Sequence, residues 1–234
     1  MGPGALTAAL LLLVGSLATS ARGLDVSIRT TTAAVVVRGG AAEVSARLFD
    51  ADGTEMPGLV IERDATRVSI VLARAVRPGA RVEARVPAEI TLHVEASNGG
   101  PVTVYAVHGQ IEIVNSNAPI VLDAVGGTVI ASTSNGPITA TLRSIDSAWP
   151  LSFLTSNGAI DVTFPASLKA ALCLETDTGP IASDFALVPA GGPVDRTMMR
   201  GGRLRTLQCG SVNGGGPDIR LRTENAPIHV RKGP

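Results

Sequence analysis

Aromatic residues are scarce in this sequence, at 3% of 234 residues, with one Trp, one Tyr and four Phe. The core must therefore be built mainly from Val, Ile, Leu and Ala. Charged residues make up 17% and hydrophobic residues 45%, which excludes the composition of a disordered chain. Basic and acidic residues balance at 20 each, so the excess positive charge of nucleic-acid-binding proteins is missing and no nucleic-acid partner is expected.

Long apolar runs are also scarce, and the most prominent one extends from Ala8 to Ala18. It is too short to span a bilayer, and small residues follow it as far as Ala21. This layout is typical of a secretory signal peptide over residues 1–21. We therefore expect an exported protein, which is periplasmic, cell-surface or secreted, with no transmembrane segment after cleavage. An uncleaved anchor stays open as an alternative, because no Lys or Arg precedes the run.

Cysteine occurs only twice, as Cys173 and Cys209. An exported protein with two cysteines can form one disulfide at most. A disulfide between them and two separate thiols that pack as small apolar residues both remain open.

Motifs that carry chemistry are missing from the sequence. The three histidines, His93, His108 and His229, do not have the spacing of metal ligands. There is no Gly-x-Ser-x-Gly, phosphate-binding loop or Cys-x-x-Cys. We therefore expect no catalytic residues, no cofactor and no metal. Four carboxylates would be the candidates if the chain were a β-helix enzyme that acts on carbohydrate: Asp161, Glu175, Asp177 and Asp184.

What the sequence does contain is a repeat. Tripeptides that begin with a small residue and end in Ile or Val place their apolar members at 102, 111, 120, 129 and 138, nine residues apart. Alternate units carry a preceding Asn, as in Ser116-Asn117-Ala118 and Ser134-Asn135-Gly136, so the true period is 18 residues. The spacing loosens to 22 and 21 residues in later units. Self-similarity of this kind is typical of a stacked repeat architecture.

The residues that follow each unit alternate between apolar and polar. Ile138, Ala140 and Leu142 share one face, and Thr139 and Thr141 share the other. This period of two predicts strands with one buried face. Like units 18 residues apart are most naturally stacked, which predicts an all-β, flattened parallel β-solenoid with about 18–22 residues per coil. An antiparallel sandwich is the alternative fold.

The Asn residues at the corners are expected to stack into a ladder that stabilises the structure. Asn-Gly also tolerates the positive φ that tight turns require, and we expect that conformation at these corners. The predicted ladder comprises Asn98, Asn117, Asn135, Asn157, Asn213 and Asn225.

The region before the repeats, residues 22–95, has shorter alternating segments separated by turn signals such as Asp52-Gly53 and Pro78-Gly79. We expect an irregular β region that caps the solenoid, because an uncovered edge strand invites aggregation. The repeats occupy residues 96–234. Residues 144–150 and 186–204 interrupt them and are predicted to be inserted loops.

The inserted loops supply the candidate binding residues, because function often lies on loops. These are Trp149 in the first loop, and Arg196 and Arg200 in a basic part of the second. Trp149 either forms a small aromatic patch with Tyr105 and Phe153 or covers an edge of the core.

Three segments have a wider resemblance. LTSNGAIDV at 154–162, TDTGPIASDF at 176–185 and GSVNGGGPDI at 210–219, in that order, are similar to the bacterial "putative adhesin" family of exported Ser-Asn-Gly repeats, also called toast-rack domains. The resemblance implies a β-solenoid in the cell envelope and implies no catalytic residues. Ala118 and Ala226 depart from the family pattern, in which Gly is usual.

Taken together, these patterns favour a non-enzymatic, adhesin-like or structural module whose partner is an envelope protein or a glycan. The first alternative is an envelope sensor or binding module that uses its inserted loops. A carbohydrate-active β-helix enzyme is the second, because such enzymes are built on stacked β-strands too.

Overall fold

The computed structural model describes residues 23–98, 100–146, 148–189, 195–200 and 203–234, and only the backbone of 195–200 and 203–204. The regular structure of these residues consists of β-strands, which confirms the all-β prediction. The predicted signal peptide, residues 1–21, lies outside the described residues.

The strands are short, and most are separated by turns of a few residues. Their bounds are β1 Asp25–Thr30, β2 Ala34–Arg38, β3 Ser45–Phe49, β4 Glu55–Met56, β5 Leu59–Arg63, β6 Arg67–Leu72, β7 Arg81–Arg85, β8 Glu89–Ala96, β9 Val102–Tyr105, β10 His108–Asn115, β11 Ile120–Thr133, β12 Ile138–Ile145, β13 Leu151–Thr155, β14 Ile160–Phe164, β15 Ala170–Thr176, β16 Ile181–Ser183, β17 Asp195–Arg200, β18 Arg203–Val212, β19 Asp218–Thr223 and β20 Ile228–Lys232.

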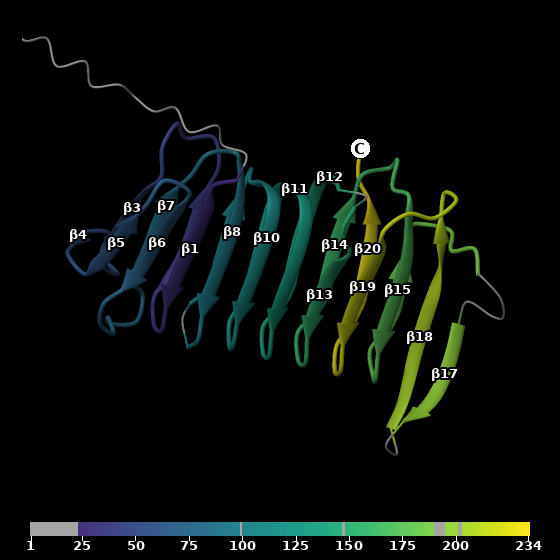
Figure 1. Ribbon diagram of the computed structural model, residues 1–234. Helices are drawn as coiled ribbons and strands as arrows, with labels where there is room; N and C mark the ends of the chain where they lie inside the picture. The colour runs from purple at the N-terminus through teal and green to yellow at the C-terminus, as the bar shows by residue number, and fades with distance from the viewer. Residues whose placement is uncertain (1–22, 99, 147, 190–194, 201–202) are drawn as a thin grey trace, which may run out of the picture.

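The strands form one curled sheet with two arms, which are joined through β11 (Figure 1). The start of β11 pairs with β9, and its last four residues pair with β13. The first arm runs in the order β5–β6–β1–β8–β10–β11–β13–β19–β15–β18–β17. The second arm runs in the order β4–β3–β7–β2–β9–β11–β12–β14–β20–β16.

The apolar faces of both arms share a single core. Alternate residues along the strands are buried, and those of both arms belong to one cluster. The rings of Phe153 on β13 and Phe164 on β14 meet edge to face, with centroids 6.5 Å apart. Burial of this apolar surface is the main stabilising contribution to the fold.

Successive nine-residue units lie alternately in the two arms. Ile120 pairs with Val102 on one side and with Ile138 on the other, in the second arm. The intervening units, Ile111 and Val129, pair with each other in the first arm. Like units therefore lie beside like units, 18 residues apart along the chain.

Strand direction is mixed, so the prediction of a parallel stack holds only in part. The interior pairings of both arms are parallel, whereas β3–β4, β3–β7, β5–β6, β15–β18 and β17–β18 are antiparallel. All of these exceptions lie toward the ends of the arms. Three of them, β3–β4, β5–β6 and β17–β18, are hairpins, which need no crossover connection. Residues 186–204, expected as a loop, accordingly contain β17 and the start of β18. In the other predicted loop, Ser144 and Ile145 still belong to β12.

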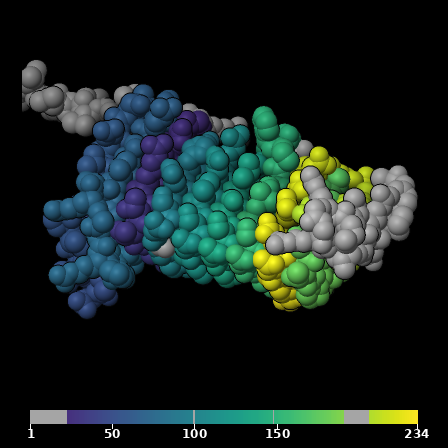
Figure 2. All heavy atoms as spheres, turned by 90° about the horizontal axis from the view of Figure 1, so that it is seen from below, coloured from purple at the N-terminus to yellow at the C-terminus, as the bar shows by residue number. Residues whose placement is uncertain are grey.

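The order of strands in space departs from their order along the chain. The last strands, β19 and β20, lie between β13–β14 and β15–β16, and are drawn yellow between green neighbours in Figure 1. Similarly, β1 lies between β6 and β8. The result is an elongated body with early strands at one end and strands of the last third at the other (Figure 2).

Glycine at the Asn corners serves close packing rather than positive φ. Gly136 and Gly158 do not have left-handed φ values, so the expected conformation is wrong there. A Cβ on Gly136 would overlap the carbonyl of Ala118, and one on Gly158 would overlap the carbonyl of Gly136. Left-handed residues occur instead at the other corner, where Gly127 has a φ of 94° and Ala124 a φ of 55°.

Buried threonines line the inside of the Asn corners. Thr155 Oγ1 donates to the carbonyl of Gly136 at 3.0 Å, and the hydroxyl of Thr133 donates to Ala118 at 3.2 Å. Thr223 and Thr176 make the same bond to Gly158 and Ala226, at 2.9 and 3.1 Å. These hydroxyls satisfy carbonyls that water does not reach.

Candidate functional site

Five of the predicted ladder asparagines form one continuous chain of side-chain hydrogen bonds along the exposed corner. Asn117 Nδ2 donates to Asn98 Oδ1 at 3.2 Å, and Asn135 donates to Asn117 at 2.7 Å. Asn157 donates to Asn135, and Asn225 donates to Asn157, both at 2.7 Å. The three inner amides each use their NH₂ on one neighbour and their carbonyl oxygen on the next, so the ladder acts as a structural element.

Asn213, the sixth predicted member, is not part of the ladder. It has a φ of 48°, and its Nδ2 donates to the Leu168 carbonyl at 2.7 Å. Asn213 lies in the turn that leads from β18 into β19, and Gly214 and Gly215 in this turn also have positive φ. The sequence Asn-Gly is the same as at the ladder corners, but here it lies in the connection between β18 and β19, which pair with opposite edges of β15.

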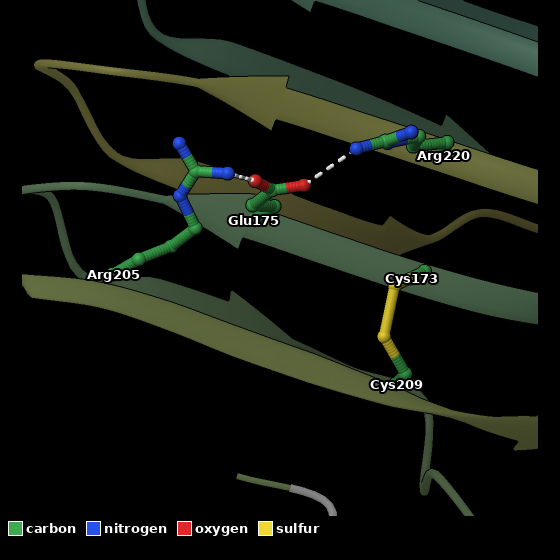
Figure 3. Close-up of a disulfide and its surroundings, with 5 residues drawn as sticks. All are labelled: Cys173, Glu175, Arg205, Cys209 and Arg220. Atoms are coloured by element: carbon green, nitrogen blue, oxygen red, sulfur yellow. Dashed lines mark hydrogen bonds and ion pairs between the residues drawn. A yellow bond between two sulfur atoms is a disulfide. The ribbon is translucent and has the colours of Figure 1, made fainter. Parts of the chain in front are cut away.

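Cys173 and Cys209 are joined by a disulfide with an S–S distance of 2.03 Å (Figure 3). They face each other on β15 and β18, with Cα atoms 4.2 Å apart. The bond therefore attaches the β17–β18 hairpin to the parallel part of the first arm. Arg196 and Arg200 lie in β17, but their side chains lie outside the described part of the chain.

A buried charge network lies beside the disulfide. The side chain of Glu175 is 5% exposed and pairs with Arg205 and with Arg220, whose Nη2 lies 2.7 Å from the carboxylate (Figure 3). Arg222 approaches Glu175 at 3.6 Å. The side chain of Asp177 is 6% exposed and accepts a hydrogen bond from Arg205 Nε at 2.9 Å. A buried carboxylate persists only when it is paired, so these contacts explain both acidic residues as structural.

Asp161 and Asp184 also have hydrogen-bond partners within the protein. Arg231 donates from Nε and Nη2 to both oxygens of Asp161, at 2.8 to 3.0 Å. These hydrogen bonds hold the pKa of Asp161 below its usual value of 3.8, with a smaller contribution from the charge of His229. Asp184 Oδ2 accepts the backbone N–H of Lys232 at 3.1 Å.

Trp149 does not form the aromatic patch considered from the sequence. Phe153 is fully buried against Phe164, and Tyr105 lies on the second arm, where the guanidinium of Arg38 stacks on its ring at 4.5 Å. Trp149, in contrast, is 54% exposed, so it does not cover the core. The patch fails because alternation along β13 turns Phe153 inward.

Trp149 borders a small hollow of about 220 Å³ on the outer face of the first arm. Thr128 lines the same hollow, is only 8% exposed, and has an Oγ1 with no hydrogen-bond partner. Ile130 on β11 is 41% exposed beside them. Gln110 and Glu112 supply polar groups from β10.

A second hollow, of about 500 Å³, adjoins the first, since His93 and Glu112 line both. His93 lies between two carboxylates, with Nδ1 at 3.0 Å from Glu112 and Nε2 at 3.8 Å from Asp25. Asp25 Oδ1 is a second buried oxygen that lacks a hydrogen-bond partner. The sequence pattern does not predict a site that combines Asp25, His93 and Glu112. Alternation could have shown that they face outward, but only the strand register brings them together.

The described residues show no clustering of the three histidines. His93 lies on β8, His108 starts β10, and His229 lies on β20 with Nδ1 3.9 Å from Asp161. No group of three or more His, Cys, Asp or Glu in the described residues could hold a metal ion. The same residues contain no helix of the length and hydrophobicity needed to cross a membrane.

The chain was compared with family models, with curated proteins and with solved structures. No family model and no curated protein matches it. Among solved structures, it is similar to a "putative cell adhesion protein" from Clostridium sporogenes ATCC 15579, at 10% identity and a TM-score of 0.39. The similarity covers 91% of this chain and 95% of that one.

Proposed function

We propose that this chain is an exported, non-enzymatic, adhesin-like module: a flattened β-solenoid that presents one outer face to a partner in the cell envelope or on a surface. The observation that carries the proposal is the exposure of Val114, Ile130 and Trp149, at 45%, 41% and 54%, on the outer face of the first arm. Exposed apolar groups that gather among polar residues are typical of an interaction surface.

Export is supported by two independent features. Residues 1–21 have the layout of a secretory signal peptide. The disulfide between Cys173 and Cys209 is of the kind that persists in oxidising compartments. We expect the protein secreted from a bacterial host to begin near residue 22, which the mass of its N-terminal peptide would measure. A retained N-terminus would favour the anchored alternative.

A non-catalytic role is supported by the carboxylates. Each of the four acidic residues considered as catalytic candidates contacts an arginine or accepts a hydrogen bond from a backbone N–H. These residues are Asp161, Glu175, Asp177 and Asp184. Such pairing keeps a carboxylate ionised and oriented toward its partner, which suits a structural role better than proton transfer.

The experiment is retention of the purified, secreted chain on isolated cell-envelope fragments and immobilised glycans, with release of reducing sugar measured in parallel. We expect saturable retention without release. Ile130→Asp should weaken retention, whereas Thr139→Asp, an exposed position on the outer face of β12, should leave it unchanged. Sugar release by the wild type would overturn the non-enzymatic proposal, and equal retention by both variants would overturn the assignment of the face.

A further inference from the structure

We infer that the two adjoining hollows on the outer face of the first arm bind a neutral oligosaccharide, with one pyranose ring against Trp149. The inference rests on the proposed function and names its ligand class. It begins from Thr128, which is more than nine-tenths buried and has a hydroxyl that no protein group bonds. An unpaired buried hydroxyl is costly, and a hydroxyl-bearing ligand in the hollow would satisfy it.

The smaller hollow combines the two surfaces that a sugar ring requires. Trp149, Pro150 and Ile130 provide an apolar wall for the C–H face of a pyranose. Thr128 and Gln110 provide donors and acceptors for its hydroxyls. A volume of about 220 Å³ is below the roughly 300–1,000 Å³ of pockets for drug-sized ligands, so this hollow accommodates a single ring.

The register of the strands extends the site beyond one ring. Asp25 pairs with Thr91, Thr91 with Gln110, and Gln110 with Thr128, so these four residues form one row across β1, β8, β10 and β11. Three strand spacings separate Asp25 from Thr128, which is about 14 Å. Asp25 lines the larger hollow and Thr128 the smaller one, and each has a buried oxygen without a hydrogen-bond partner, so the two residues mark two ends of a groove that one ring cannot span.

The charges of the larger hollow exclude an acidic glycan. Four carboxylates line it against two guanidiniums, namely Asp25, Glu62, Glu95, Glu112, Arg29 and Arg67. Both guanidiniums are already paired, Arg29 with Glu95 at 3.6 Å and Arg67 with Asp25 at 3.6 Å. A uronate or sialate carboxylate placed here would be repelled, whereas neutral hydroxyls can donate to Asp25 and Glu112.

The test uses the single tryptophan of the chain as its reporter. The intact secreted protein is titrated with cellotetraose and with chitotetraose, and Trp149 emission and calorimetric heat are recorded. A tri-galacturonate titration is the matched anionic control. We expect a saturable change in emission with at least one neutral tetrasaccharide and none with tri-galacturonate.

Variants locate the site. Trp149→Ala should weaken calorimetric binding by at least about tenfold, as expected for an aromatic anchor. Thr128→Val should weaken it several-fold, and Trp149→Phe should restore most of the affinity lost in Trp149→Ala. Tyr105→Ala, on the second arm, is the control aromatic and should bind as the wild type does. Circular dichroism of each variant confirms its folding.

The outcomes separate this inference from the proposed function. If a tetrasaccharide binds equally to wild type, Trp149→Ala and Thr128→Val, the groove is not the site, although the adhesin-like function stands. If only tri-galacturonate binds, the ligand class is wrong. If no sugar changes the emission or produces heat, the inference is overturned, and retention on envelope fragments decides the proposed function by itself.

Discussion

At the scale of single residues, the hydroxyl of Thr155 joins two corners of the stack. It donates to the Gly136 carbonyl at 3.0 Å and accepts the backbone N–H of Gly158 at 3.2 Å. The repeated Thr two places before the corner Asn was the available signal for this inner ladder. Only the structure shows that these hydroxyls face inward, across the corner.

We predict that Thr155→Val lowers the free energy of unfolding by about 1–2 kcal/mol, because two buried backbone groups lose their partner while the shape is kept. Thr139→Val is the matched control, since Thr139 is exposed, and it should change stability by no more than about 0.5 kcal/mol. Urea denaturation of both variants measures the difference. Equal stabilities would contradict the structural role of the hydroxyl.

The ion pair between Asp161 and Arg231 leads to a prediction about the stability of the fold in acid. The pKa of Asp161 is lowered by the hydrogen bonds from Arg231, so the ion pair stabilises the fold above the unfolded-state value of 3.8 and is lost as the pH falls through the lower folded value. Asp161→Asn should therefore be less stable than the wild type near neutral pH, by less than about 1 kcal/mol because the pair is partly exposed. The difference should shrink as the pH falls below 3.8 and disappear once the pH is below the lowered pKa of the folded state. Thermal melts from pH 2 to 8 test this, and a gap that widens in acid would refute it.

At the scale of elements, two glycines that both have positive φ differ in how closely a neighbouring strand approaches them. Gly127 combines a φ of 94° with a Cβ position that would overlap the carbonyl of Gly109. Gly53 has a φ of 84° but open space around it. A comparison of Gly53 with Gly127 therefore separates the cost of backbone strain from the cost of close packing between neighbouring strands.

We predict that Gly53→Ala costs about 1 kcal/mol, which is the strain of a left-handed alanine. Gly127→Ala should cost roughly 3 kcal/mol, because the overlap with Gly109 adds to the same strain. Chemical denaturation compares them. If the two variants lose the same stability, close approach of neighbouring strands is not what selects glycine at position 127.

The nine-residue repeat does not predict the strands at the ends of the arms. The antiparallel β17–β18 hairpin contacts the rest of the first arm through the pairing of Glu175 with Arg205 and through the disulfide. Periodicity predicts segments that resemble one another. A hairpin that closes the stack need not resemble the units it covers, so nothing in the period indicates it.

At the scale of the whole molecule, the last strands of the chain are in the interior of the stack. Removal of the terminal unit is usually tolerated in a repeat protein that stacks in chain order, because each unit contacts only its neighbours. Here β19 and β20 contribute the buried residues Ile219, Leu221, Ile228 and Val230 between two other layers.

We therefore predict that truncation after Gly216 abolishes cooperative thermal unfolding, since β13–β14 and β15–β16 both lose a parallel partner. Calorimetry of the truncated chain measures the transition. Adding the peptide 217–234 should restore part of it, because the vacated layer can be refilled. A truncated chain that melts like the full protein would rule out the interior position.

Some features followed from the amino-acid sequence alone. Alternation and the nine-residue spacing determined the all-β class and the stacking of like units, because both are local properties of a strand with one buried face. The corner asparagines followed in the same way, except at Asn213, where identical residues lie in a different turn. Local pattern could not distinguish these two settings.

The tertiary structure alone decided the order of the strands and the candidate binding groove. Backbone hydrogen bonds between parallel strands depend little on which side chains the strands carry. The sequence around Ile228 is therefore equally compatible with a strand at the end of the stack and with its actual position between Ile160 and Ile181. The groove exists because that register aligns Asp25 with Thr128 in one row across four strands, 103 positions apart in the chain. Residues so distant can be related only by the pairing of strands.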